Sequence, residues 1–161
     1  MNRGKVTDIA ELPACLAPGG RLLGLDVGTK TIGLAVSDGA RRLATPAGTI
    51  RRTKFKADMA ALQAEIASRQ AAALIIGLPV NMDGSEGPKC QSVRQFAANV
   101  GGLIDLPIVL WDERLSTAAV TRSLVEQDVS RARRKEVVDT HAATYILQGA
   151  LDRLGVLDAS A

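Results

Sequence analysis

Hydrophobic residues along the chain occur either in short continuous runs or at helical spacing. Short apolar runs bounded by Gly, Pro and polar residues are typical of strands that are covered on both faces. Apolar positions that recur every three or four residues are typical of a helix with one buried face. These patterns predict strands at residues 22–27, 32–37, 43–50, 72–78 and 106–111. They predict helices at residues 53–70, 88–101, 116–127 and 135–154.

The order of these elements predicts a mixed sheet in an α/β fold. Three strands come before the first helix, and helices then alternate with strands. Because strand–helix–strand crossovers are right-handed, the fourth strand is expected beside the first and parallel to it, with the fifth beside the fourth. We therefore predict a five-stranded sheet of order 3-2-1-4-5, with strand 2 antiparallel, flanked by helices. Pro46 cannot donate a hydrogen bond to a neighbouring strand, which places the third strand at the sheet edge.

The composition predicts one folded domain. The chain has 161 residues, of which 47% are hydrophobic, so a disordered chain is excluded. We predict a single domain at residues 21–154, an irregular leader at 1–20 and a tail at 155–161. No apolar run approaches the ~18 residues of a membrane span, and the N-terminus does not resemble a signal peptide. The two cysteines have no metal or redox spacing, and Cys90 falls on an apolar helix stripe, so a reduced, cytoplasmic protein is expected.

Three acidic residues stand within or directly beside apolar segments of the predicted fold. Asp26 interrupts the first apolar run, and burying an ionised carboxylate is costly unless it is paired or holds a cation. Glu113 follows the fifth strand, and Asp139 shares a helix face with Ala143 and Ile146. Since ligands bind beyond the carboxyl ends of parallel strands, the three acids are candidates for one site that holds Mg²⁺ or Mn²⁺. Alternatively, Asp139 pairs with a basic neighbour near the start of its helix.

The distribution of positive charge suggests a polyanionic partner. Ten of the 20 lysines and arginines lie within residues 39–57 and 131–135, although two solvated loops would account for this as well. Aromatic residues make up only 2% of the chain, which favours recognition of a nucleic-acid backbone over base stacking. The candidate nucleic-acid contacts are Lys30, Arg51, Arg52, Lys54, Arg114, Arg131, Arg133, Arg134 and Lys135.

Four short motifs occur in order along the chain. They are LDVGTKTIGLAVSD at 25–38, GLPVNMDGS at 77–85, DERLST at 112–117 and DTHAA at 139–143. As a set, over residues 21–154, they resemble the YqgF family of RuvC-like nucleases, described as pre-16S rRNA nucleases and as Holliday junction resolvase-like. The resemblance implies a ribonuclease H-like fold and a cytoplasmic role in maturing the 5′ end of 16S rRNA. It also implies that Asp26, Glu113 and Asp139 are the catalytic, metal-binding acids.

The loop of the second motif is a candidate substrate contact. Its residues Asn81, Asp83, Gly84 and Ser85 are suited to a loop over the substrate, and a structural Asx turn accounts for them almost as well. Lys30 follows the first hairpin turn, where it is either a phosphate contact or a solvated lysine.

Other polar residues have a structural and a functional interpretation. Arg114, next to Glu113, is a candidate to orient that acid or to bind phosphate. Thr117 is expected to cap a helix. His141 lies about 160° from Asp139 around the helix, so we expect it to be solvated and not to act as the catalytic base.

We predict a hydrolase, a metal-dependent nuclease that processes the 5′ end of precursor 16S rRNA in ribosome biogenesis. It is expected to act as a monomer or weak dimer, with the pre-ribosome as a candidate partner. One alternative is a Holliday junction resolvase acting on branched DNA, for which a two-fold dimer is favoured. Another is a non-catalytic nucleic-acid-binding module, against which the three intact acids argue. Residues 24–29 also resemble the first phosphate loop of actin-like ATPases and sugar kinases, but those proteins need two such domains and this chain has the length for one.

Overall fold

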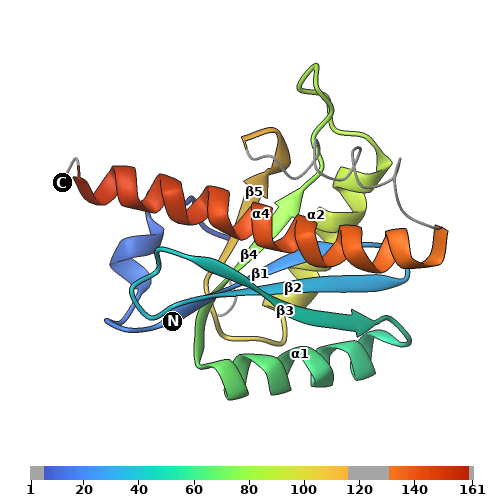
Figure 1. Cartoon of the computed structure of the whole chain (residues 1–161), viewed down its shortest axis with the longest axis horizontal. Coiled ribbons are helices and arrows are strands. Elements are labelled where there is room, and N and C mark those ends of the chain that lie inside the picture. Colours follow the sequence, from blue (N-terminus) through green and yellow to red (C-terminus); the bar gives the residue numbers. More distant parts are fainter. Residues whose placement is uncertain (1–5, 116–130, 160–161) are drawn as a thin grey trace.

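The computed structural model describes residues 6–115 and 131–159, with the backbone alone at 131–140 and at 159 (Figure 1). Its elements are η1 (Leu12–Cys15), β1 (Arg21–Val27), β2 (Thr31–Ser37), β3 (Ala44–Arg51), α1 (Phe55–Arg69), β4 (Ala71–Leu78), α2 (Pro88–Gly101), β5 (Ile108–Asp112), η2 (Glu113–Leu115) and α4 (Arg131–Ala159). The helix expected at 116–127 lies outside the described residues. Every other expected strand and helix is present, with its ends shifted by a few residues.

The five strands form one sheet in the order β3-β2-β1-β4-β5, as predicted. Strand β1 pairs antiparallel with β2 and parallel with β4, and β4 pairs parallel with β5. Strand β3, which contains Pro46, lies at the edge. The carboxyl ends of β1, β4 and β5 therefore meet at one end of the sheet, where ligands bind in folds of this kind.

Helices cover both faces of the sheet, since successive strand residues point to opposite sides. Figure 1 shows α4 across one face and α1 with α2 on the other. The α2 stripe is buried as predicted, including Cys90, whose thiol pKa is raised by burial. In α1, Met59 and Leu62 are buried, but Phe55, expected on the same stripe, is 37% exposed because it stands at the first residue of the helix.

Residues 6–20, before β1, hold one short 3-10 helix in otherwise irregular backbone and pack against the folded domain. Val6 forms a parallel bridge with Ile108 of β5, and the Thr7 N–H donates a hydrogen bond of 2.7 Å to the Ile108 carbonyl oxygen. Leu12, in the short helix η1, is fully buried in the core under α4. This segment therefore covers part of the β5 edge, which would otherwise be open to pairing with another chain.

Helix α4 is longer than the predicted helix at both ends. Residues 131–135 belong to the helix and not to a basic loop, which corrects the loop expected there. Arginine and lysine are good helix formers, and no Gly or Pro interrupts this stretch. Residues 155–159 likewise continue the helix and form no separate tail. Within the described ranges, no helix combines the length and apolar character that crossing a membrane requires.

Helix α4 approaches the sheet closely above two glycines. A Cβ atom at Gly24 would lie 2.8 Å from the Cβ of Leu147 and 3.2 Å from the carbonyl oxygen of Ala143. A Cβ atom at Gly77 would lie 3.0 Å from Cγ1 of Ile146. The helix therefore lies directly on the backbone of β1 and β4.

Replacing Gly24 by alanine is expected to lower the free energy of unfolding by about 1–3 kcal/mol, the range for overpacked core positions. The added methyl group would collide with a backbone oxygen and a Cβ atom, which cannot rotate away. Chemical denaturation measures the change. Gly155→Ala is the matched control, because nothing lies within 4 Å of a Cβ there, and it should raise stability by ~0.5–1 kcal/mol. Wild-type stability in Gly24→Ala would contradict the close packing of α4.

Candidate active site

Asp26 lies near the end of β1, on the face covered by α4. Leu22 and Gly24, which precede it at two-residue spacing, both lie under this helix. Asp26 is only 8% exposed, and its partner in β2 is Gly33. A carboxylate at this depth must be balanced by hydrogen bonds or positive charge.

Glu113 begins η2 directly after β5 and is 4% exposed. Its Cγ atom lies 3.3 Å from the place that a Cβ of Gly77 would occupy, so the side chain crosses over β4. The parallel register pairs Leu25 with Ile76, and continuing it by one residue puts Gly77 beside Asp26. Gly77 thus lies between the two strands whose ends carry the buried acids, with Asp26 after β1 residue Leu25 on one side and Glu113 after β5 on the other.

Gly77 is a site residue to which the sequence analysis assigned no role. Its lack of a side chain makes the space that Glu113 and the helix residue Ile146 enter. The available signal was a glycine near the end of an otherwise apolar strand, which marks a place where another group approaches the backbone.

Asp139 belongs to the part of α4 whose side chains lie outside the described residues. The helix backbone places residue 139 one turn before Ala143, whose carbonyl oxygen lies over Gly24. Further along the helix, the side chain of Gln148 hydrogen-bonds the start of β3, at the other end of the sheet. Helix α4 therefore runs from the end of the sheet that holds Asp26 toward the opposite end.

The loop between β4 and α2 is ordered by its own hydrogen bonds and projects away from the sheet (Figure 1). The Ser85 N–H and hydroxyl donate to Oδ1 of Asp83 at 2.9 and 2.6 Å, and these bonds lower the pKa of Asp83. The Asn81 amide donates to the Ser85 hydroxyl oxygen, and the Gly84 N–H donates to the Asn81 carbonyl oxygen. Gly84 has a φ of 91°, which favours glycine. The four predicted loop residues therefore form one self-contained turn.

Arg114 lies between this loop and the end of β5. Its Nε and Nη2 donate to the Asp112 carboxylate at 3.0 and 2.7 Å, and this ion pair raises the pKa of Arg114 and lowers that of Asp112. Nη1 lies 3.6 Å from the position of a Cβ on Gly84. The structure thus places Arg114 against the loop, and its contact with phosphate stays a prediction.

Three exposed basic residues lie at the end of the sheet that holds Asp26. Lys30 is in the turn between β1 and β2, Arg51 pairs with Thr31 at the start of β2, and Lys54 is the N-cap residue of α1. Their positive charge is available to a ligand at this end of the molecule.

The basic stretch at 39–57 is divided between the two ends of the sheet. Arg41 and Arg42 follow β2 at the end opposite to Asp26, where Nη1 of Arg41 donates to the Gly20 carbonyl oxygen at 2.7 Å. Arg41 thus stabilises the entry to β1. Arg41 and Arg51 lie at opposite ends because β3, which separates them in sequence, runs along the whole of β2.

The remaining residues singled out in the sequence have varied positions. Arg131, Arg133, Arg134 and Lys135 are in the first turns of α4, where only the backbone is described. His141 is exposed, as expected. Thr117 lies outside the described residues.

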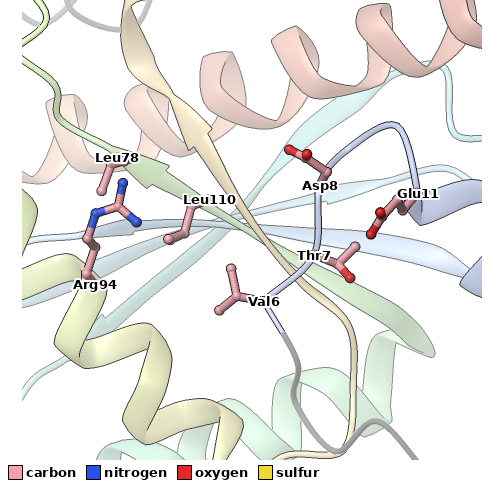
Figure 2. A pocket seen from close by; sticks show the side chains of 7 residues that line it. All are labelled: Val6, Thr7, Asp8, Glu11, Leu78, Arg94 and Leu110. Atoms are coloured by element: carbon pink, nitrogen blue, oxygen red, sulfur yellow. The ribbon is translucent and has the colours of Figure 1, made fainter.

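A hollow of about 440 Å³ lies between the segment before β1, β4, β5 and α2 (Figure 2). Its lining residues are Val6, Thr7, Asp8, Glu11, Leu78, Arg94 and Leu110. Leu78 and Leu110 pack in the core covered by α1 and α2, whereas Asp26 and Glu113 lie on the side of α4. The hollow is therefore separate from the candidate site.

The sheet order, with acids at the carboxyl ends of its parallel strands, defines the class as a ribonuclease H-like fold. Residues 20–153 match the model of the RuvX family, which is described as Holliday junction resolvase. The chain belongs to the RuvX family, which is also called YqgF and is a family of nucleases. The resemblance to the YqgF family that the four motifs indicated is therefore confirmed.

Relatives are similar over most of their length. A protein of Bradyrhizobium sp. (strain ORS 278) is 66% identical over 138 residues, which cover 86% of each chain. A protein of Methylocella silvestris is 58% identical over 158 residues, which cover 98% of each chain. Both are named "Putative pre-16S rRNA nuclease". Among solved structures, T. thermophilus RuvC in complex with Holliday junction substrate is 14% identical with a TM-score of 0.45, covering 84% of this chain and 96% of that chain.

Replacing Ser85 by alanine is expected to raise the pKa of Asp83 part of the way to its ordinary value. The Ser85 hydroxyl is the main cause of the lowered pKa, and the Ser85 N–H remains in the variant. Because the pKa of Asp83 is lowered in the fold, these hydrogen bonds stabilise the loop when the pH is above the ordinary pKa range of a carboxyl group. This stabilisation is lost as the pH falls through the lowered pKa. An NMR titration of the Asp83 carboxyl carbon measures the shift.

Asp38 is the internal control for this titration. Its pKa is lowered by the N–H groups of Arg42 and Leu43, at the other end of the sheet, and it should be the same in both proteins. An Asp83 pKa that does not move in Ser85→Ala would contradict the hydroxyl contact.

Proposed function

We propose that this chain is a divalent-metal-dependent nuclease that hydrolyses phosphodiesters at the 5′ end of precursor 16S rRNA, in the cytoplasm, during ribosome biogenesis. The proposal is carried by the placement of two buried acids at the carboxyl ends of the parallel strands, with Asp26 beside Gly77 in the sheet register and Cγ of Glu113 over Gly77. Membership of a nuclease family supports the reaction, and the names of the two relatives support the RNA substrate.

The residues present suit Mg²⁺ or Mn²⁺. These hard cations prefer carboxylate oxygens, and Asp26 and Glu113 supply such oxygens on one face of the sheet. Among the side chains that the structure describes, which do not include Asp139, no three acids, histidines or cysteines form a metal-binding group. We assign the third ligand to Asp139, because α4 carries it one turn beyond Ala143 toward the same end of the sheet.

Each acid has a defined support in the fold. When bound, the metal would activate the attacking water and stabilise the leaving oxygen of the phosphodiester. Asp26 is held by a central strand, Glu113 by η2 and the gap above Gly77, and Asp139 by α4. His141 is exposed, and we assign it no part in the reaction.

Basic residues on both sides of the acids are proposed to neutralise the phosphates of the RNA. Lys30, Arg51 and Lys54 lie at the β2 and β3 side, and Arg114 lies with the loop of Asn81, Asp83, Gly84 and Ser85 at the β5 side. The start of α4 contributes Arg131, Arg133, Arg134 and Lys135. With few aromatic residues available for stacking, the proposed recognition is of backbone and shape.

A Holliday junction is the second candidate substrate, because the family is described as Holliday junction resolvase. Resolution of a junction requires two symmetric cuts, which a two-fold dimer provides. We propose a monomer or weak dimer acting on RNA, so the two candidates differ in substrate and in assembly.

The purified chain is expected to shorten precursor 16S rRNA in the presence of Mg²⁺ or Mn²⁺ and to lose this activity with a chelator. Asp26→Asn, Glu113→Gln and Asp139→Asn should each lower the rate by more than about 100-fold, since even outer partners of metal ligands contribute about 10–100-fold. Gel analysis of the RNA ends measures the rate. Asp38→Asn is the matched control, because this exposed acid is at the opposite end of the sheet and asparagine can still accept its hydrogen bonds.

The same assay separates the alternatives. Cleavage of a four-way DNA junction with no cleavage of RNA would favour the second candidate. Binding of nucleic acid without metal-dependent cleavage would indicate a non-catalytic module. Cleavage that persists in Asp26→Asn or with a chelator would overturn the proposed mechanism.

Removing Arg133 and Arg134 together, by alanine substitution, is expected to weaken RNA binding and to flatten its dependence on salt. Each lost phosphate contact reduces the slope of log K against log salt by about 0.7–0.9. Binding of labelled RNA at several salt concentrations measures the slope. Arg42→Ala, at the far end of the sheet, should leave it unchanged. An unchanged slope in the double variant would mean that residues 131–135 are a solvated stretch that does not contact the RNA.

A further inference from the structure

Arg52 points into the protein, although the sequence analysis predicted a nucleic-acid contact. Its side chain is 28% exposed. Nη1 donates a hydrogen bond of 2.6 Å to the carbonyl oxygen of Gly28, and Nε lies 3.9 Å from Oδ2 of Asp58. The guanidinium lies over the ring of Phe96, 5.4 Å from its centroid. One side chain therefore joins the turn after β1 to α1 and α2.

Arg52 directly follows β3, and because its N–H still pairs with the Lys30 carbonyl oxygen, the alternation of the strand continues through it. Ile50 lies in the core under α1 and α2, so Arg52, two residues later, is on the same side, and Arg51 is on the side of α4. Asp26 also lies on the side of α4. Of the two neighbouring arginines, Arg51 is thus on the side of the acids and Arg52 on the opposite side.

The turn that Arg52 holds begins two residues after Asp26. The Gly28 N–H donates to the Thr31 carbonyl oxygen at 2.9 Å, and a Cβ on Gly28 would lie 3.0 Å from the same oxygen. The backbone N–H of Arg52 donates to the Lys30 carbonyl oxygen at 2.8 Å. Arg52 therefore holds this tight turn both through its backbone and through its guanidinium.

Asp58 gives the guanidinium a rigid support. It is 4% exposed, and its Oδ1 accepts a 2.9 Å hydrogen bond from the Thr53 N–H. It lies in the first turn of α1, where the helix dipole stabilises an acid. Contacts other than Arg52 therefore hold the carboxylate in place, and this distinguishes the pair from a surface ion pair between two mobile side chains.

We infer that Arg52 is a positioning residue, which fixes the β1–β2 turn and thereby holds Asp26 and Lys30 in the arrangement that catalysis requires. The inference rests on the proposed function. Lysine would not replace Arg52 in this role, because an ammonium group is a point charge, whereas a guanidinium is planar, stacks on a ring and donates in a fixed fork. A residue that only contacts phosphate would tolerate lysine.

Arg52→Lys is the first test, with kcat, KM and the salt dependence of RNA binding as readouts. We expect kcat to fall by about 10- to 100-fold, the cost of a small misplacement, while KM and the salt slope stay the same because the charge is kept. Phe96→Leu, which removes the ring beneath the guanidinium, should lower kcat in the same direction. Arg42→Lys is the matched control and should behave as the wild type.

Amide hydrogen exchange at Gly28 is the second test and needs no nuclease activity. Exchange should be faster in Arg52→Lys, with the midpoint of global unfolding little changed, because the turn loses its tether. Faster exchange in a chain that cleaves neither substrate would support the tether and overturn the proposed function. Unchanged exchange together with an unchanged kcat would overturn the inference. A raised KM and flatter salt slope in Arg52→Ala, both restored by lysine, would instead make Arg52 a phosphate contact.

Discussion

Helix α4 lies directly on the backbone of β1 and β4 because glycines stand beneath it at positions 24 and 77. Each glycine gives up the stabilisation that a buried side chain would supply, and in return the helix axis comes closer to the sheet. This close approach determines what the first turns of α4 can reach. A larger residue at either position would move the helix outward and separate it from the carboxyl ends of the strands.

The same glycine at 77 links the packing of the helix to the electrostatics of the site. Asp26 lies beside this glycine in the sheet register, Cγ of Glu113 lies 3.3 Å from the place of its missing Cβ, and both acids are buried. Burying an ionised carboxylate costs free energy that hydrogen bonds, ion pairs or a bound cation must offset. In the proposed metal centre, the bound cation offsets that cost, and metal binding and folding stability are therefore coupled.

Much of the fold could be predicted from the sequence because its signals are local. Continuous apolar runs identified the strands, and the right-handedness of crossovers led to the sheet order that is confirmed. The burial of Leu12 could not be predicted, since Pro and Gly around it remove any period, and its contacts depend on α4, far along the chain. The separation of Arg41 from Arg51 was missed for a different reason. Residues close in sequence lie at opposite ends of the sheet when a hairpin runs between them.

The two arginines at the end of β3 show what charge counting leaves out. Composition treats Arg51 and Arg52 as equal contributors to a basic surface, yet Arg51 ends β3 and Arg52 follows it in extended backbone, so the two side chains point to opposite faces. Ile50 in the core already indicates which face Arg52 shares, so this direction was open to prediction from alternation. The partners on that face were not, because Phe96 and Asp58 come from two helices that only the tertiary fold brings together. A basic residue beside a candidate site is therefore assigned to ligand or to scaffold by its neighbours, and Arg52 belongs to the scaffold.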